Sequence, residues 1–339
     1  MQSQFIVFPA KARIEIREEQ IAAPAPDEIL CAATKSLISI GTETNCLRGI
    51  FDPGTNWENF VQYPFRPGYS MVARVLAVGK AVADFKEGDR ITSRTPHQQF
   101  FNTKLTDTFR LPDSISDEDA TWTRLAGTTQ LGVRRAELKL GESVAVIGLG
   151  MLGQLVVQYA AIAGARRVIA IDPVLNRLTL AQTHGATHTL ALDAKSAHAV
   201  VAEITHGRML DAVFDVTGHP AVLAPAVQLL RKFGRVVLLG DTTLPNQQFI
   251  GPGVVSNSIS ILGIHGTGHP AQATEFSPWS REEMATLFFD YLVQGRMRVN
   301  DLITHHVSPL EAPPVYSQLL ADRAGMVGVV FDWMTLSEG

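Results

Sequence analysis

A glycine-rich turn at residues 148–153 constrains the fold of this chain more than any other feature of its sequence. The turn reads Gly-Leu-Gly-Met-Leu-Gly, directly after an apolar run at 144–147 and at the start of an amphipathic segment. A lone G-x-G-x-x-G match is weak, but a strand before it and a helix after it are the context in which it binds a dinucleotide. The first glycine permits the tight turn, the second lets the backbone approach the pyrophosphate, and the third allows close helix packing. The predicted cofactor contacts in this turn are Gly148, Gly150, Met151, Leu152 and Gly153.

Asp172 indicates which dinucleotide the turn would take. It ends the apolar run at 168–171, about 20 residues beyond the turn, where an acidic side chain accepts hydrogen bonds from the ribose hydroxyls. A carboxylate there repels a 2′-phosphate, so the sequence predicts NAD as the cofactor. The alternative for Asp172 is a turn residue at the end of a strand. Further cofactor contacts are predicted at Arg177, Thr217, Gly240 and His265.

The length of the chain predicts two domains. Its 339 residues exceed the size, about 250 to 300 residues, at which one hydrophobic core stops growing. Residues 1–117 read as strands separated by Gly and Pro turns, whereas the next segment alternates apolar runs with helical periodicity, as βαβ units do. We therefore predict an α/β protein with a Rossmann domain at 118–270. It would be inserted in a β-rich domain made of residues 1–117 and 271–339.

The Rossmann segment is expected to contain six strands in a doubly wound parallel sheet. The predicted strands lie at 143–147, 167–171, 189–192, 212–215, 236–239 and 260–264. The predicted helices between them lie at 152–163, 176–183, 197–205 and 220–232. In the tail we expect helices at 281–294 and 313–320, a short strand at 302–303 and a last strand at 328–333.

Charge and cysteine content exclude several classes of function. A net charge of −4 gives no electrostatic footprint for nucleic acid or an anionic membrane, so we expect a small-molecule partner. The most apolar helical stretch, residues 155–165, is shorter than the roughly 20 residues that span a bilayer. The only two cysteines, Cys31 and Cys46, cannot form a disulfide framework or a four-cysteine zinc lobe. We expect a cytoplasmic protein.

Five segments together give the chain a family resemblance over nearly its whole length. They are Gly41-Thr42-Glu43, Pro67-Gly68 before SMVARVLAVG, Gly88-Asp89-Arg90, the glycine-rich turn, and Leu302-Ile303-Thr304-His305. In their order the chain resembles the medium-chain dehydrogenase/reductase superfamily. It is most similar to the threonine, polyol and sorbitol dehydrogenase branch and its bacteriochlorophyllide-dehydrogenase-like relatives. The resemblance implies a GroES-like catalytic domain that carries the inserted Rossmann domain, and a homodimer or homotetramer.

The resemblance also implies where a catalytic zinc would bind. The three ligand positions of the zinc-dependent members fall on Ile40, Tyr69 and Thr123, and the glutamate beside the histidine ligand falls on Ser70. Ile40 has no donor atom, and Tyr and Thr are poor zinc ligands at neutral pH. We therefore predict no metal. An alternative is a replacement set of Cys46, Glu43 and His97, which has suitable side chains but no recognised spacing.

The candidate catalytic residues follow from the same correspondence. Thr42 stands where the family places a hydroxyl against the substrate oxygen, and the relay histidine of the family is Asn45 here. The phenol of Tyr69 either acts on the substrate oxygen or fills the volume of the missing metal. Glu43 either takes part or only holds its loop. His97 either lines the cleft or supports it, and His265, after the last Rossmann strand, borders the expected substrate pocket or is only structural.

These residues predict a zinc-independent oxidoreductase that transfers a hydride between NAD(H) and a secondary alcohol or ketone. The expected substrate is a polyol, a sugar or a cyclitol. A quinone or enoyl reductase of the same superfamily is a second possibility. A third is a non-catalytic NAD-binding sensor, because a fold does not dictate a function.

Overall fold

The chain divides into two compact units in a computed structural model that describes residues 1–106, 108–270, 272–275 and 277–336. One unit consists of Met1–Arg124 and Arg281–Gly339, and the other is Leu125–Ser280. The predicted boundary between residues 270 and 271 involves Ala271, which lies outside the described residues. The assignment of a separate function to each unit stays a prediction.

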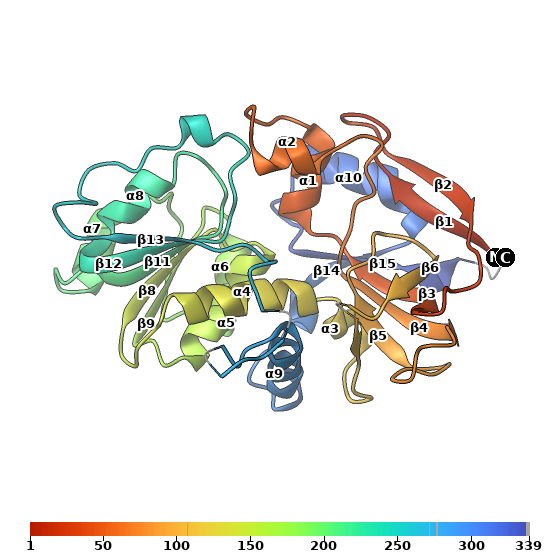
Figure 1. Cartoon of the computed structure of the whole chain (residues 1–339). Coiled ribbons are helices and arrows are strands. Elements are labelled where there is room, and N and C mark those ends of the chain that lie inside the picture. Colours follow the sequence, from red (N-terminus) through yellow and green to blue (C-terminus); the bar gives the residue numbers. More distant parts are fainter. Residues whose placement is uncertain (107, 271, 276, 337–339) are drawn as a thin grey trace. The chain divides into compact units, whose positions relative to one another are not determined.

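The first unit is built on a seven-stranded sheet in the order β14-β15-β3-β4-β5-β7, with β6 also paired to β3 (Figure 1). Its long central strand β3 runs antiparallel to both β4 and β15. Val330 pairs with Leu37, so the end of the chain completes a sheet that begins near its start. The strands are β3 (Glu28–Leu37), β4 (Met71–Val78), β5 (Arg90–Ser93), β6 (Phe100–Lys104), β7 (Phe109–Arg110), β14 (Ile303–Val307) and β15 (Gly328–Asp332).

Short helices and a separate hairpin complete this unit. β1 (Gln2–Val7) and β2 (Glu15–Gln20) pair with each other in a two-stranded sheet, and Phe5 of β1 also forms an isolated antiparallel bridge with Gln98. The helix α1 (Ile40–Arg48) follows β3 and ends at Gly49, whose φ of 61° is the left-handed conformation that closes helices. The other helices are α2 (Asn56–Phe60), α3 (Asp117–Ala120), α9 (Arg281–Val293) and α10 (Ala312–Ala321), and α4 (Thr123–Arg135) leads from this unit into the other.

The second unit is a six-stranded parallel sheet in the order β10-β9-β8-β11-β12-β13. All five residues of β8 are buried, as expected of a central parallel strand covered on both faces. α5 packs on β8 and β9, and α8 packs on β11 and β12. The strands are β8 (Ser143–Ile147), β9 (Arg167–Ile171), β10 (His188–Leu190), β11 (Leu210–Asp215), β12 (Leu230–Leu238) and β13 (Ser260–Gly263). The helices are α5 (Met151–Ile162), α6 (Leu175–Thr183), α7 (His198–Ile204) and α8 (Leu223–Gln228).

The predicted fold class is therefore confirmed: an antiparallel β-rich sheet is combined with a six-stranded parallel sheet of the Rossmann type. Most predicted elements are present with ends shifted by a few residues. In the described part of the chain, no helix is both long enough and apolar enough to cross a membrane.

The predicted helix at 220–232 is wrong over its last turn, since α8 ends at Gln228 and β12 begins at Leu230. Leu230 pairs with Leu210 in the parallel ladder before a bulge, and the ladder resumes at Arg235. Within the bulge, Phe233 has a φ of 62°, which a helix cannot contain. The sheet contacts of Leu230 therefore outweigh the helical pattern of the local sequence.

Candidate active site

The three glycines of the predicted cofactor turn are required for three different reasons. Gly148 has a φ of 89°, and a β-carbon there would lie 2.8 Å from the methyl group of Thr217. A β-carbon on Gly153 would lie 2.0 Å from the carbonyl oxygen of Gly148, so close packing of α5 excludes a side chain. Gly150 is different, because a β-carbon there would meet no atom within 4 Å. Its missing side chain leaves the backbone open to a ligand.

The N-terminus of α5 offers hydrogen-bond donors beside this open backbone. Gly150 is the N-cap residue and no side chain caps the helix there. The first amides of a helix have no partner within it, and the helix dipole favours an anion at this end. Met151, Leu152 and Gly153 form that first turn, so the residues present fit a dinucleotide pyrophosphate.

Asp172 follows β9 directly and is held by two backbone amides. Its Oδ2 accepts a hydrogen bond from Leu149 N at 2.7 Å, and its Oδ1 accepts one from Val174 N at 2.8 Å. The guanidinium of Arg177 lies 4.0 Å from Oδ2. Asp172 therefore ties the end of β9 to the glycine turn, and its predicted contact with a ribose remains a prediction.

Thr217 and Gly240 lie beyond the ends of β11 and β12, at the carboxyl edge of the same parallel sheet. Thr217 donates hydrogen bonds from its amide and its hydroxyl to Asp215 Oδ1, at 3.0 and 2.6 Å. Burial raises the pKa of Asp215, against the effect of these two bonds. A β-carbon on Gly240 would lie 2.2 Å from the amide nitrogen of Gly218. Ligands of open α/β sheets bind at this edge.

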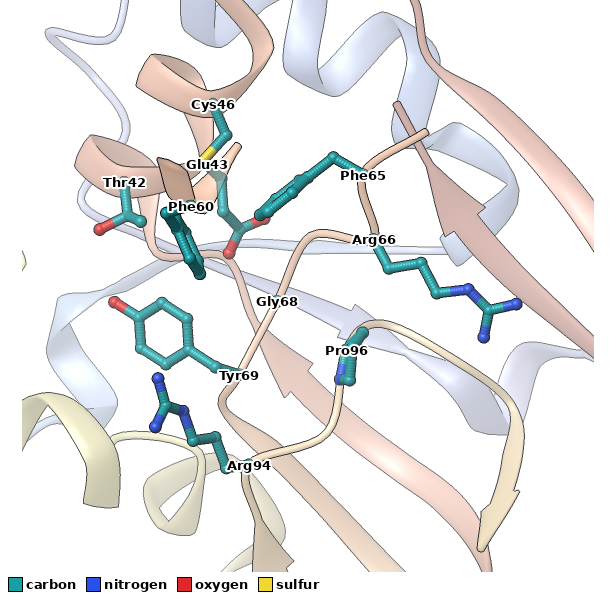
Figure 2. A pocket seen from close by; sticks show the side chains of 10 residues that line it. All are labelled: Thr42, Glu43, Cys46, Phe60, Phe65, Arg66, Gly68, Tyr69, Arg94 and Pro96. Carbon is teal, nitrogen blue, oxygen red and sulfur yellow. The ribbon is translucent and has the colours of Figure 1, made fainter. Parts of the chain in front are cut away.

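The first unit contains a cavity of about 190 Å³ beside α1 (Figure 2). Three of the predicted catalytic residues, Thr42, Glu43 and Tyr69, line it. The rings of Phe60 and Phe65 meet edge to face in its wall, with centroids 5.3 Å apart. The remaining lining residues are Cys46, Arg66, Gly68, Arg94 and Pro96.

The hydroxyl of Tyr69 belongs to a cluster of hydroxyl groups in this cavity. It lies 2.5 Å from Ser39 Oγ and forms a further hydrogen bond with Thr42. Burial raises the pKa of Tyr69 above its ordinary value, although the bonds to Ser39 and Thr42 act in the opposite direction. The phenol therefore keeps its proton near neutral pH and can donate it.

A buried hydrogen-bond network lies behind the cavity and is centred on Glu43, which is 1% exposed. Oε1 of Glu43 accepts a hydrogen bond from Ser39 N at 2.7 Å, which ties its carboxylate to the start of α1. Oε2 accepts a hydrogen bond from the Tyr316 hydroxyl and lies 3.1 Å from Nε2 of His97. Burial raises the pKa of Tyr316 well above its usual range, and the nearby charge of Glu43 adds to this effect.

His97 extends this network away from the cavity rather than lining it. Its Nδ1 lies 2.8 Å from Ser36 Oγ, which accepts a hydrogen bond from Trp333 Nε1, also at 2.8 Å. His97 is fully buried and is not among the residues that line the cavity. Its geometry fits the supporting role rather than contact with substrate.

The replacement metal set of Cys46, Glu43 and His97 finds no support in this arrangement. Burial, together with the charge of Glu43, raises the pKa of the Cys46 thiol, which opposes the thiolate that binds metals. Across the residues that the structure describes, no group of three His, Cys, Asp or Glu side chains is placed to hold a metal ion.

Comparisons with known proteins show which sequences and folds the chain is similar to. A family model described as a zinc-binding dehydrogenase matches residues 152–282. D-guloside 3-dehydrogenase of Shigella flexneri is 25% identical over 274 residues, which cover 79% of this chain and 78% of that protein. Sorbitol dehydrogenase of Bacillus subtilis is 29% identical over 238 residues, 60% of this chain and 67% of that protein. The crystal structure of an oxidoreductase/dehydrogenase of unknown specificity from Escherichia coli superposes with a TM-score of 0.81. It is 18% identical and the match covers 98% of this chain and 99% of that one.

The chain is thus similar to medium-chain, zinc-type alcohol, polyol and threonine dehydrogenases in its sequence, and it shares their fold. The relatives are named as dehydrogenases of small molecules that include sorbitol and L-threonine. The comparisons agree with the resemblance to zinc-type dehydrogenases, and the absence of zinc ligands stays a prediction.

His265 is the one predicted catalytic residue that lies in the second unit. It follows β13, is exposed, and its Nδ1 lies 2.7 Å from Thr267 Oγ1. Its contribution to the cofactor or the substrate stays a prediction.

Three residues in or behind the cavity were missed from the sequence: Ser39, Arg94 and Tyr316. Ser39 directly precedes the Ile40-Gly41-Thr42 segment, and its hydroxyl at the start of a helix was a usable signal. Arg94 and Tyr316 belong to no motif. Tyr316 lies 273 positions from Glu43 along the chain, so only the fold brings the two together.

Proposed function

We propose that this dehydrogenase transfers a hydride between NAD(H) and a secondary alcohol or ketone without a zinc ion. The substrate would be a polyol, a sugar or a cyclitol, or a derivative of one. The observation that carries the proposal is the hydroxyl of Tyr69, which lines the cavity and bonds to Ser39 and Thr42. Relatives named for D-guloside and sorbitol support the substrate class.

The side chains at the family's zinc positions support a reaction that does not use the metal. Ile40 is buried and has no donor atom. The hydroxyl of Thr123 donates a hydrogen bond to the carbonyl oxygen of Ala120 at 2.7 Å, and that of Tyr69 is bonded to Ser39. Zinc in proteins is bound by thiolate, imidazole or carboxylate. The residues present do not fit a catalytic zinc.

In its place, the chain's own hydroxyls would handle the proton. NAD(H), when bound, supplies or accepts the hydride. In ketone reduction, Tyr69 donates its phenolic proton to the substrate oxygen as negative charge develops there, and Thr42 stabilises the same oxygen by a hydrogen bond. In alcohol oxidation, the Tyr69 phenolate accepts the hydroxyl proton. Because burial raises the pKa of Tyr69, the phenol dominates at neutral pH, which favours reduction.

We also propose NAD rather than NADP as the cofactor. Asp172 keeps a carboxylate 2.7 Å from the backbone of the glycine turn, and a negative charge there disfavours a 2′-phosphate. Two solved structures with this fold differ in their cofactor: the protein from Sinorhizobium meliloti was bound to NADP, and the one from Escherichia coli to NADH. The fold alone therefore does not determine which dinucleotide is bound. Dissociation constants of NADH and NADPH, measured on wild type and Asp172→Ser, test the preference. NADH should bind more tightly, and the substitution should remove the difference.

Exposed apolar residues support a homodimer or homotetramer. β13 is the last strand of the parallel sheet, and Phe249, Ile250 and Val255 before it are exposed. An exposed sheet edge with apolar neighbours is a site where chains associate. Light scattering at several protein concentrations measures the mass directly.

The substitution Tyr69→Phe tests the proposed chemistry. It keeps the ring and removes only the hydroxyl, so we expect kcat to fall by about 100- to 1000-fold, the usual loss for one donor to a developing oxyanion. The dissociation constant of NADH should not change. Tyr291→Phe, outside the cavity, is the matched control. Turnover that survives in Tyr69→Phe would contradict the proposal.

A further inference from the structure

Arg94 differs from the other cation that lines the cavity, Arg66, in having no partner for its charge. Arg66 bonds both oxygens of Glu19, at 2.8 and 2.5 Å, and also bonds Gln98. No hydrogen bond or ion pair joins Arg94 to any other residue that the structure describes, and its side chain is exposed.

The local backbone directs Arg94 into the cavity. Its neighbours Ser93 and Thr95 are both buried, and their hydroxyls lie 2.9 Å apart. Because successive side chains of an extended segment point to opposite faces, Arg94 is turned to the face away from these two. Figure 2 shows its guanidinium reaching toward Tyr69, whereas the guanidinium of Arg66 points to the opposite side of the view.

The one carboxylate among the lining residues is not available to neutralise Arg94. Both oxygens of Glu43 are occupied, by Ser39 N on one side and by Tyr316 and His97 on the other. The apolar wall of Phe60, Phe65 and Pro96 lowers the local polarity, which strengthens a charge-assisted hydrogen bond. The cavity thus combines hydroxyls suited to a reacting oxygen with an unpaired planar cation.

We propose that Arg94 binds a carboxylate or a phosphate group of the substrate. The dehydrogenase would then act on an acidic derivative of a polyol or sugar, and a neutral polyol would be a poor substrate. This inference rests on the proposed function, since it takes the cavity beside Tyr69 as the substrate site. A guanidinium forms two parallel hydrogen bonds with either anion, so the structure favours the shared chemistry of both.

Binding can be measured without turnover, by calorimetry on the wild-type protein saturated with NADH. The probes are D-sorbitol, D-gluconate and D-sorbitol 6-phosphate, which share a polyol chain and differ in charge. At least one anionic probe should bind about tenfold or more tightly than D-sorbitol, as expected for one charge-assisted contact. Tighter binding of D-gluconate would indicate a carboxylate substrate, and tighter binding of D-sorbitol 6-phosphate would indicate a phosphate substrate. High salt should weaken the preference.

Two variants assign the effect to this residue. Arg94→Gln should bring the affinity for the anionic probe down to that for D-sorbitol, and Arg94→Lys should restore part of it. Arg13→Gln removes an exposed arginine outside the cavity and should change nothing. Equal affinities in wild type, no binding of either anion, or a preference that survives in Arg94→Gln would each overturn the inference.

Turnover separates this inference from the proposed function. Loss of the anion preference in Arg94→Gln, in a protein with no dehydrogenase activity on any probe, would uphold the anion site and contradict the hydride transfer. Turnover of D-sorbitol as fast as that of both anionic probes, with no change for any probe in Arg94→Gln, would do the reverse.

Discussion

The glycine turn of the parallel sheet and the cavity beside α1 are held in shape by different kinds of contact. Around the turn, the contacts are between backbone groups. Gly153 packs on the carbonyl of Gly148, and Asp172 accepts hydrogen bonds from two amides. Around the cavity, side chains from distant parts of the sequence hold one another, as Glu43 does with His97 and Tyr316.

This difference has a consequence for how each region tolerates change. A turn held by backbone contacts, such as the glycine turn, needs small residues at a few positions and tolerates many different residues elsewhere. A side-chain network depends on the identity of each member, because a buried polar group left without a partner is costly. The glycine turn can therefore stay recognisable while the side chains around the cavity change.

The largest expected effect is the loss of stability on removing the centre of the network. Glu43→Ala leaves His97, Tyr316 and the amide of Ser39 without their acceptor, so we expect a cost of about 4 kcal/mol in the free energy of unfolding. Urea denaturation followed by tryptophan fluorescence measures it. Glu87→Ala, an exposed carboxylate, is the control and should cost little. A cost below about 1 kcal/mol for Glu43→Ala would mean that the network does not support the cavity.

The glycine turn offers a matched pair of substitutions with separable outcomes. Gly153→Ala places a β-carbon 2.0 Å from a backbone oxygen, so we expect a destabilisation of about 2 to 3 kcal/mol. Gly150→Ala meets no atom within 4 Å and its φ of −70° suits any residue, so stability should change by less than about 0.5 kcal/mol.

NADH affinity separates the two glycines further. Gly150→Ala should weaken NADH about tenfold although the protein stays folded, because the added methyl group occupies the open cradle. Thermal unfolding and calorimetric titration with NADH provide the two readouts. Unchanged NADH affinity in Gly150→Ala would contradict the prediction that this turn binds the cofactor.

The last expected effect is on pH dependence and concerns the cavity alone. The raised pKa of Tyr69 leaves little phenolate near neutrality, so kcat for alcohol oxidation should rise up to about tenfold per pH unit between about pH 7 and 9. Ketone reduction uses the phenol and should stay flat over the same range. Initial rates in both directions measure this. If the oxidation rate reached a plateau below about pH 9, a group other than Tyr69 would accept the hydroxyl proton of the substrate.

The same contrast explains what the sequence could predict. The βαβ order and the glycine turn depend on local patterns, so strands such as β8 and β9 were predicted with their correct ends. The end of α8 was predicted wrongly, because Leu230 pairs with Leu210 of β11, a contact that the local sequence does not reveal.

At the cavity, the sequence could predict the residues of motifs but not their partners. Thr42, Glu43 and Tyr69 were found because they stand at family positions, and the structure places all three around one cavity. Tyr316 and Arg94 could not be found, since their roles arise only when α10 and the end of β5 are brought to the same place. The sequence marked His97 as a candidate because of its imidazole. Only the structure shows that it is buried and lies beside Glu43.

The central proposal, that hydroxyls take the place of a catalytic metal in this protein, is tested most directly by turnover after chelation. The protein is dialysed against a strong zinc chelator, its zinc content is measured by mass spectrometry, and NADH-dependent reduction is assayed before and after zinc is added back. We expect full turnover at a zinc content far below one ion per chain, with no gain on adding zinc. Turnover that is lost on chelation and restored by zinc would contradict the account.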